Sequence, residues 1–253
     1  MKIAVSGKGG VGKTTLSALL AKSFADDNLK VIAIDADPDA NLAEALGFPP
    51  ELEITPLVEM RDLIKERVGA EPDQATVYFT MNPRVDDIPD KFSISIDNIK
   101  LLVMGTVRRG GSGCACPQNV MVKQLLGHVL FQRDEIVIMD MEAGIEHLGR
   151  GTSQFVDLLC AVVEPTSASL KTWIRIRKLA EDLNIKKTAI IANKVSNEQD
   201  RQRIQSVTGE TPWCEIPFSD SLSDYNKEEI PPEIREQIST LKKKIQRELM
   251  HGN

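Results

Sequence analysis

Short runs of apolar residues alternate along the chain with longer stretches of helical periodicity. The runs show little alternation between apolar and polar positions, which is typical of strands covered on both faces of a parallel sheet. The predicted strands span residues 2–6, 30–34, 99–104, 135–139, 158–163 and 188–192. The predicted helices span residues 14–25, 57–68, 120–131, 170–183 and 232–249. This alternation predicts an α/β fold with a doubly wound, mostly parallel sheet, in which ligands bind at the carboxyl ends of the strands.

No linker divides this pattern. The chain has 253 residues, and no stretch rich in proline, glycine or serine interrupts it. A chain of this length is ordinary for one α/β domain, so we expect a single domain over residues 1–253.

Charge and apolar content argue against several classes of function. A formal net charge of −6 gives no general electrostatic footprint for nucleic acid or an anionic membrane, although local basic patches stay possible. No run approaches eighteen apolar residues, and the first predicted strand begins directly after Met1, so we expect neither a transmembrane helix nor a signal peptide. These features predict a cytoplasmic protein that acts on neither nucleic acid nor membrane, with its four cysteines as thiols.

A glycine-rich loop lies between the first predicted strand and the first predicted helix. Residues 7–15 read Gly-Lys-Gly-Gly-Val-Gly-Lys-Thr-Thr, which fits the frame G-x-x-x-x-G-K-[ST] of a phosphate-binding loop. The glycines allow a tight turn that gathers backbone N–H groups where the helix dipole also favours an anion. Lys13 would reach the β- and γ-phosphates of ATP, and the Thr14 hydroxyl would bind Mg²⁺. The expected nucleotide contacts are Gly9, Gly10, Val11, Gly12, Lys13, Thr14 and Thr15.

Lys8 is the unusual member of this loop, because it cannot easily fold back onto phosphates that Lys13 already contacts. We expect it to point outward, either as a solvated charge or toward another molecule. The stretch from Lys8 to Thr15 resembles the deviant loop of the nitrogenase iron protein and of the septum-site and partition ATPases. In that class the early lysine crosses a two-fold interface to the partner's nucleotide, as an arginine finger does. The resemblance implies a homodimer with ATP between its subunits and a catalytic role for Lys8 and Lys13.

Two predicted strands end in carboxylates close to the expected phosphate site. Asp35, Asp37 and Asp39 follow the second strand, where a carboxylate could orient the attacking water. The resemblance selects Asp37 for this catalytic role, whereas Asp35 and Asp39 could be structural caps. Asp140 has the apolar-run-then-Asp pattern that supports Mg²⁺ through water, and Gly144 would sense the γ-phosphate through its N–H. A solvated acidic turn is the alternative for Asp37 and Asp140.

The adenine contacts rest on two segments late in the chain. Asn193 ends a predicted strand, and its amide could pair with both a donor and an acceptor on a purine edge. The resemblance supports Asn193 and the adjoining Lys194 as part of the nucleotide site, and it implies that the segment at Pro217 closes over the base. A turn amide and a turn proline are the alternatives.

Cys114 and Cys116 stand two positions apart, among glycines and just before a predicted helix. The backbone there is free to bring both sulfurs to one centre, and a helix N-terminus favours the thiolate that binds metal. One pair supplies two ligands, but a two-fold dimer supplies four, which suits tetrahedral Zn²⁺ or planar Ni²⁺. A redox disulfide or two small buried residues are the alternatives.

The other cysteines and two histidines carry weaker signals. Cys160 lies in an apolar run and is expected in the core, and Cys214 has no partner nearby in the sequence. His128 and His147 could assist a metal, but a structural or solvated role is favoured for each.

Three stretches make the resemblance more specific, namely residues 104–116, residues 139–148, and Glu164-Pro165 with residues 169–172. They resemble the nickel-insertion ATPases of carbon monoxide dehydrogenase maturation, and the likeness runs nearly from end to end. That family implies an ATP-hydrolysing metallochaperone whose two C-x-C pairs bind Ni²⁺ or Zn²⁺ at a dimer interface. The implied client is a nickel–iron–sulfur enzyme, and the related acetyl-CoA synthase is an equally natural client.

Two functions of other classes stay in view. Apolar residues from Ile234 to Leu249 form a stripe with lysines around it, as in the interfacial helix of a positioning ATPase that acts on membrane or DNA surfaces. Docking of this helix on the sheet of its own chain is the favoured alternative. Cysteines shared across a two-fold axis would also suit an electron-transfer ATPase with a bridging iron–sulfur cluster.

Overall fold

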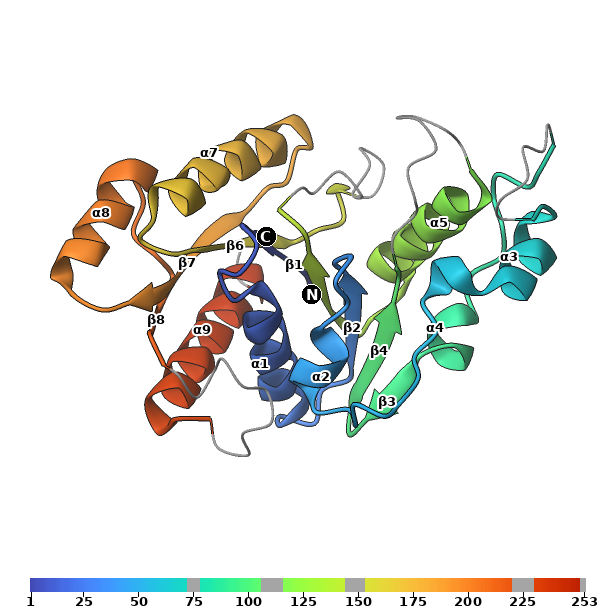
Figure 1. Cartoon of the computed structure of the whole chain (residues 1–253), viewed down its shortest axis with the longest axis horizontal. Coiled ribbons are helices and arrows are strands. Elements are labelled where there is room, and N and C mark those ends of the chain that lie inside the picture. Colours follow the sequence, from blue (N-terminus) through green and yellow to red (C-terminus); the bar gives the residue numbers. More distant parts are fainter. Residues whose placement is uncertain (72–77, 106–115, 144–152, 220–229, 251–253) are drawn as a thin grey trace.

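A mostly parallel sheet forms the centre of the molecule (Figure 1). The computed structural model describes residues 1–71, 78–105, 116–143, 153–219 and 230–250. Within these ranges, eight strands follow the order β3-β4-β2-β5-β1-β6-β7-β8, and each neighbouring pair is parallel except β3 with β4. The doubly wound α/β fold predicted from the sequence is therefore confirmed. The strands are β1 Lys2–Gly7, β2 Val31–Ala36, β3 Ile94–Ile96, β4 Ile99–Val103, β5 Ile136–Met141, β6 Leu158–Val163, β7 Thr188–Val195 and β8 Cys214–Pro217.

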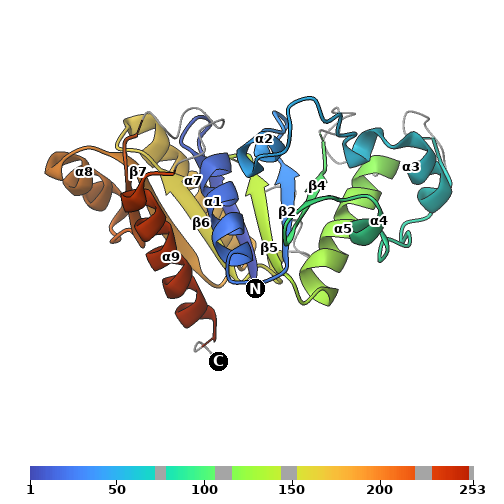
Figure 2. The same ribbon diagram turned by 90° about the horizontal axis from the view of Figure 1, so that it is seen from below.

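Helices cover both faces of this sheet (Figure 2), and an apolar cluster lies under each layer. One layer holds α1, α2 and α9, and the other holds η1, α3, α4, α5, α7 and α8. Because the central strands β1, β5 and β6 are covered on both sides, every one of their residues is buried. The helices are α1 Lys13–Ala25, α2 Leu42–Leu46, η1 Leu57–Glu59, α3 Arg61–Val68, α4 Ile88–Lys91, α5 Pro117–Gln132, α7 Ser167–Asp182, α8 Glu198–Thr208 and α9 Pro232–Met250.

Several elements at the margins of the fold differ from the sequence-based expectation. The single helix expected over residues 57–68 was wrong, because η1 ends before Met60 (φ −75°, ψ 75°) and α3 begins after it. Apolar residues on both pieces are buried in the same cluster, which explains why the periodicity continues across the break. The edge strands β3 and β8 are only three and four residues long. They were not predicted, because no long apolar run marks them in the sequence.

The C-terminal helix α9 docks on its own chain. Its apolar stripe is buried beside α1, with Ile234, Ile238, Leu241 and Ile245 all at most 3% exposed. Lys242 donates to the carbonyl oxygen of Ser23 at 2.7 Å. The expectation that this helix docks on the sheet of its own chain is therefore confirmed. The apolar stripe no longer supports an interfacial helix. No helix within the described ranges is long and apolar enough to cross a membrane.

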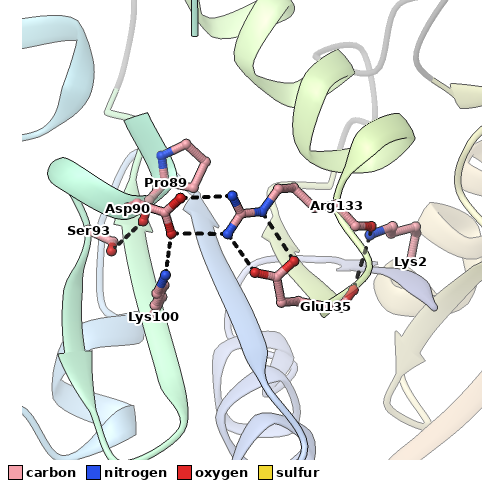
Figure 3. A network of polar contacts seen from close by, with 7 residues as sticks. All are labelled: Lys2, Pro89, Asp90, Ser93, Lys100, Arg133 and Glu135. Carbon is pink, nitrogen blue, oxygen red and sulfur yellow. Dashed lines mark hydrogen bonds and ion pairs between the residues drawn. The ribbon is translucent and has the colours of Figure 1, made fainter. Parts of the chain in front are cut away.

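A network of ion pairs ties helices to the amino-terminal edge of the sheet (Figure 3). The Arg133 guanidinium lies between two carboxylates, 2.9 Å from Asp90 and 2.5 Å from Glu135. Lys100 in β4 also pairs with Asp90, and Lys2 at the start of β1 donates to the carbonyl oxygen of Glu135 at 3.1 Å. Arg133 and Lys100 hold the pKa of the Asp90 carboxyl well below its usual range. The network links α4 and the end of α5 to β1 and β4.

Candidate functional site

The glycine-rich loop connects β1 to α1 at the carboxyl edge of the sheet. Gly12 directly precedes α1 with φ of 95°, and Gly10 has φ of 78°. Residues other than glycine rarely adopt these backbone conformations. A Cβ atom on Gly7 would lie 2.5 Å from the carbonyl oxygen of Val162 in β6. The loop is thus held tightly against its neighbouring strand, and its last residue opens a helix whose positive end favours an anion.

The loop borders a cavity of about 430 Å³, a size typical of small-molecule sites. Residues expected from the sequence that line it are Gly9, Gly10, Gly12, Lys13, Thr14, Thr15, Asp37, Asn193, Lys194 and Pro217. Phe218 and Ser219, which belong to the segment expected to close over the base, also line it. Further lining residues, to which the sequence assigned no nucleotide contact, are Asp39, Asn41, Glu142 and Ala143. Each of these residues follows a strand whose end carries a residue expected at the nucleotide site. Position just after such a strand end is the signal in the sequence that could have identified them. Val11 lies apart, with its side chain buried in the core.

Lys13 and Asp37 form an ion pair at the wall of this cavity. The Lys13 Nζ lies 3.4 Å from the Asp37 Oδ2, and the two side chains are 6% and 14% exposed. A phosphate chain is negatively charged like this carboxylate, so it can replace Asp37 as the ion-pair partner of Lys13. Asp37 would then be free to accept a hydrogen bond from water.

Asp140 is a buried carboxylate at the end of β5 that meets the start of α1. It accepts hydrogen bonds from the hydroxyl of Thr14 at 2.6 Å and from that of Ser17 at 3.2 Å. Burial raises the pKa of Asp140 to about 6, and the Thr14 hydroxyl opposes this shift. Hydroxyl and carboxylate oxygens beside a phosphate-binding loop are the ligand types that Mg²⁺ prefers. The residues present therefore fit Mg²⁺ on Thr14, with Asp140 behind it.

Asp35 is a second fully buried carboxylate, and it lies opposite Asp140 in the parallel register of β2 and β5. Its two oxygens accept the backbone N–H groups of Asp37 at 3.2 Å and of Leu42 at 2.9 Å. The interpretation of Asp35 as a structural cap is confirmed, because it fixes both ends of the loop that carries Asp37. Burial raises the pKa of Asp35 to about 7.

Asp35 should make the chain less stable as the pH rises. The pKa of this carboxyl is about 7 when folded and 3.8 when exposed, so between these values the folded chain keeps a proton that the unfolded chain has released. Raising the pH through this window therefore favours unfolding. We expect the wild type to lose about 2 kcal/mol more stability between pH 5 and pH 7.5 than Asp35→Asn, measured by urea unfolding without nucleotide. Exposed Asp39→Asn is the control, and equal losses in wild type and Asp35→Asn would contradict the assignment.

Asn193 braces the loop from β7. Its side-chain nitrogen donates to the carbonyl oxygen of Val11 at 2.7 Å, and its side-chain oxygen accepts the N–H of Lys194 at 2.9 Å. A Cβ atom on Gly12 would lie 2.3 Å from the Asn193 nitrogen. The amide therefore has protein partners at both ends, and its adenine contact stays a prediction. Pro217 ends β8 beside the exposed ring of Phe218.

Part of the predicted metal and switch region lies outside the described residues, namely Cys114, Gly144 and His147. Cys116 is described, and it directly precedes α5, so the expected position just ahead of a helix is confirmed for this thiol. Cys160 and Cys214 are buried free thiols, and burial raises the pKa of each to about 12. Within the described part of the chain no three His, Cys, Asp or Glu side chains gather as a metal site.

Comparison with known proteins places this geometry in a family. Residues 2–232 match the family described as the CobQ/CobB/MinD/ParA nucleotide binding domain. The carbon monoxide dehydrogenase accessory protein CooC of Rhodospirillum rubrum is 53% identical over 202 residues, which are 79% of this chain and 76% of that protein. An ATP-binding protein of Methanocaldococcus jannaschii is 49% identical over 216 residues, or 85% of this chain and 83% of that protein.

Solved structures agree on the fold. The MinC:MinD cell division complex of Aquifex aeolicus has a chain that superposes with a TM-score of 0.69 at 20% identity, covering 97% of this chain and 95% of that one. A ParA family ATPase of Chlorobium tepidum gives a TM-score of 0.70 at 17% identity, covering 95% and 98%. The chain therefore belongs to the CobQ/CobB/MinD/ParA family of nucleotide-binding proteins and, within it, to the group of the carbon monoxide dehydrogenase accessory protein CooC.

Proposed function

We propose that the chain is an ATP-hydrolysing metallochaperone that binds Ni²⁺ or Zn²⁺ through Cys114 and Cys116 at the interface of a homodimer. Its client would be carbon monoxide dehydrogenase or acetyl-CoA synthase, into which it would assist nickel insertion. The observation that carries this proposal is the 53% identity to an accessory protein of carbon monoxide dehydrogenase. The loop, cavity and carboxylates described above support the ATP-dependent part.

The residues around the cavity would divide the work of ATP hydrolysis. The loop N–H groups and Lys13 hold the phosphates, and the Asp37 carboxylate, once freed from Lys13, orients the attacking water. Thr14 would hold Mg²⁺, with Asp140 supporting it through water, and the ion when bound neutralises charge that develops on the β- and γ-phosphate oxygens. Gly144 would report the presence of the γ-phosphate to its switch segment.

A homodimer would complete the site. The Lys8 side chain is 42% exposed and does not line the cavity of its own chain. This arrangement supports a role for Lys8 on the nucleotide of a second copy, where its charge would act as an arginine finger does. The proposed dimer would also bring two C-x-C pairs together, so that four thiolates could bind one metal ion.

Nucleotide and metal would then be coupled through dimer closure. If ATP favours the closed dimer and the closed dimer binds metal better, Ni²⁺ must raise the affinity for ATP by the same factor as ATP raises the affinity for Ni²⁺. Titrating each ligand in the presence of the other tests this reciprocity. Affinities that are independent of one another would reject the coupling.

The double variant Cys114→Ser/Cys116→Ser is expected to lose metal and keep nucleotide. Serine hydroxyls are poor ligands for Ni²⁺ and Zn²⁺, so bound metal should fall at least about tenfold from about one ion per two chains. The measurement is elemental analysis after loading with Ni²⁺ or Zn²⁺ alone. It is paired with light scattering for oligomeric state, with and without a non-hydrolysable ATP analogue.

The single variant Cys214→Ala is the matched control, because this thiol is buried in β8 on the face of the sheet opposite to α5, the helix that follows Cys116. Equal metal content in the double variant and the control would contradict the assignment of Cys114 and Cys116 as metal ligands. Brown colour with bound iron would instead favour an electron-transfer ATPase. The client is tested by mixing loaded protein with nickel-free carbon monoxide dehydrogenase or acetyl-CoA synthase and measuring the nickel that the enzyme retains.

A further inference from the structure

Glu164 directly follows β6 and lies beside the outer part of the glycine-rich loop. β6 runs parallel to β1 with Val162 opposite Gly7, so the residue two positions further on reaches the level of the loop. The backbone of Glu164 is held firmly, because its N–H donates to the Ser169 hydroxyl at 3.1 Å and its carbonyl accepts the Thr166 N–H at 2.7 Å. The side chain is only 14% exposed.

Two lysine ammonium groups converge on this one carboxylate. The Nζ of Lys194 lies 3.3 Å from Oε2, and the Nζ of Lys8 lies 4.0 Å from Oε1. The Thr166 hydroxyl also donates to Oε1 at 3.2 Å. Lys194 further donates to the carbonyl oxygen of Gly10 at 2.7 Å. Glu164 thus connects the end of β6, the end of β7 and the loop that carries Lys8.

Lys194 makes its contact with Glu164 from an unusual backbone conformation. Lys194 has φ of 59° and lies at an irregularity in the pairing of β7 with β8, between Asn193 and Val195. A left-handed conformation costs about 1 kcal/mol or more for a residue with a long side chain. Such strain persists only where surrounding contacts hold it, and here those contacts are the bonds from Lys194 to Gly10 and Glu164.

We propose that Glu164 is a positioning residue that holds Lys8 and Lys194 against the loop of the same subunit before the dimer closes. On closure, Lys8 exchanges this carboxylate for a phosphate of the nucleotide bound to the second copy. Lys194 stays with Glu164, so the carboxylate is never left without a cation. This exchange rests on the proposed function, because it requires an ATP-bound dimer, and it makes Glu164 a determinant of how readily that dimer forms.

The first test measures dimerisation of Glu164→Gln with a non-hydrolysable ATP analogue and Mg²⁺. Gln keeps the shape of Glu164 but removes the charge that retains Lys8. Closure then no longer has to break one Lys8–Glu164 ion pair in each of the two chains, so we expect the dimer dissociation constant to fall by roughly twofold to tenfold. In a Lys8→Ala background, Glu164→Gln should change nothing. Glu181→Gln removes another exposed pair, with Arg177 on α7, and serves as the matched control.

The second test uses the nucleotide-free chain and needs no dimer. Limited acylation of lysines, followed by mass spectrometry, should label Lys8 at least about twofold faster in Glu164→Gln than in wild type, because a lysine released from its carboxylate is more accessible to the reagent. The exposed Lys171 on α7 should react equally in both proteins.

The two tests separate the possible failures. An unchanged or weaker dimer in Glu164→Gln would overturn the exchange, and equal acylation of Lys8 would overturn the holding contact. A wild type that never dimerises with the analogue would reject the dimer of the proposed function, and the exchange with it. In that case the acylation rates would still decide whether Glu164 holds Lys8 within one chain.

Discussion

Replacement of Asp37 by Asn is expected to slow ATP turnover by about 100- to 10,000-fold while nucleotide binding is retained. The amide cannot accept a proton from the attacking water as the carboxylate can, although it has the same shape. The Asp37 carboxylate lies 3.4 Å from the Lys13 ammonium, where it would compete with a phosphate group. Removing its charge should therefore leave the affinity for a non-hydrolysable ATP analogue equal or higher. Phosphate release under saturating ATP and equilibrium titration measure the two effects.

Asp39→Asn is the control for this experiment. Asp39 lies on the same loop and lines the same cavity, and its N–H donates to the Asp37 carboxylate at 3.2 Å. If proximity alone mattered, both variants would lose activity to the same degree. We expect Asp39→Asn to stay within about threefold of wild type. A comparable loss in both variants would show that the loop conformation, rather than the Asp37 carboxylate, limits turnover.

Gly12→Ala is expected to lower the affinity for ATP at least about 100-fold, or roughly 2.7 kcal/mol of binding free energy. Two effects act together at this position. The backbone has φ of 95°, and the added Cβ would lie 2.3 Å from the side-chain nitrogen of Asn193. Both effects push the loop away from the geometry in which its N–H groups converge on a phosphate. Titration with a fluorescent ATP analogue measures the loss, and thermal unfolding verifies that the variant is folded.

Two matched variants separate strain from collision at Gly12. Gly9→Ala places a Cβ where no other atom lies within 4 Å, so it should cost much less affinity. The double variant Gly12→Ala/Asn193→Ala removes the collision and keeps the strained φ, but it also loses the contacts that Asn193 makes. It is therefore compared with Asn193→Ala alone, relative to which Gly12→Ala should cost less affinity than it costs in wild type. Wild-type affinity in Gly12→Ala would mean that this loop does not hold the nucleotide.

The sequence allowed prediction of those parts of the site that are set by local spacing. Gly12, Lys13 and Thr14 are neighbours in the chain, and a strand before them with a helix after them suffices to define the loop. Asp140 and Asn193 could be placed at the same edge because the carboxyl ends of parallel strands meet there. The contact between Asp140 and Thr14 additionally requires β5 to lie beside β1, which the sequence pattern alone does not specify.

Contacts that depend on strand order or on a backbone irregularity could not be predicted from the sequence. Ser17 reaches Asp140 from the second turn of α1, and no motif marks it. Glu164 meets Lys194 only because β6 and β7 are adjacent and Lys194 adopts a left-handed conformation. The break at Met60 was hidden because the two helical pieces share one apolar cluster. In each case tertiary packing, rather than local propensity, decides the outcome.

The docking of α9 on α1 has a consequence for how the protein is made. Leu241 and Ile245 are buried in the same cluster as Leu16 and Leu20, and Lys242 pairs with Asp27 just beyond the end of α1. The ribosome delivers α1 near the beginning of synthesis and α9 near its end, and domains fold as their segments emerge. The part of α1 that faces α9 therefore stays without its cover through most of translation. A nascent chain released before residue 232 would keep that part exposed, as a target for chaperones and proteases.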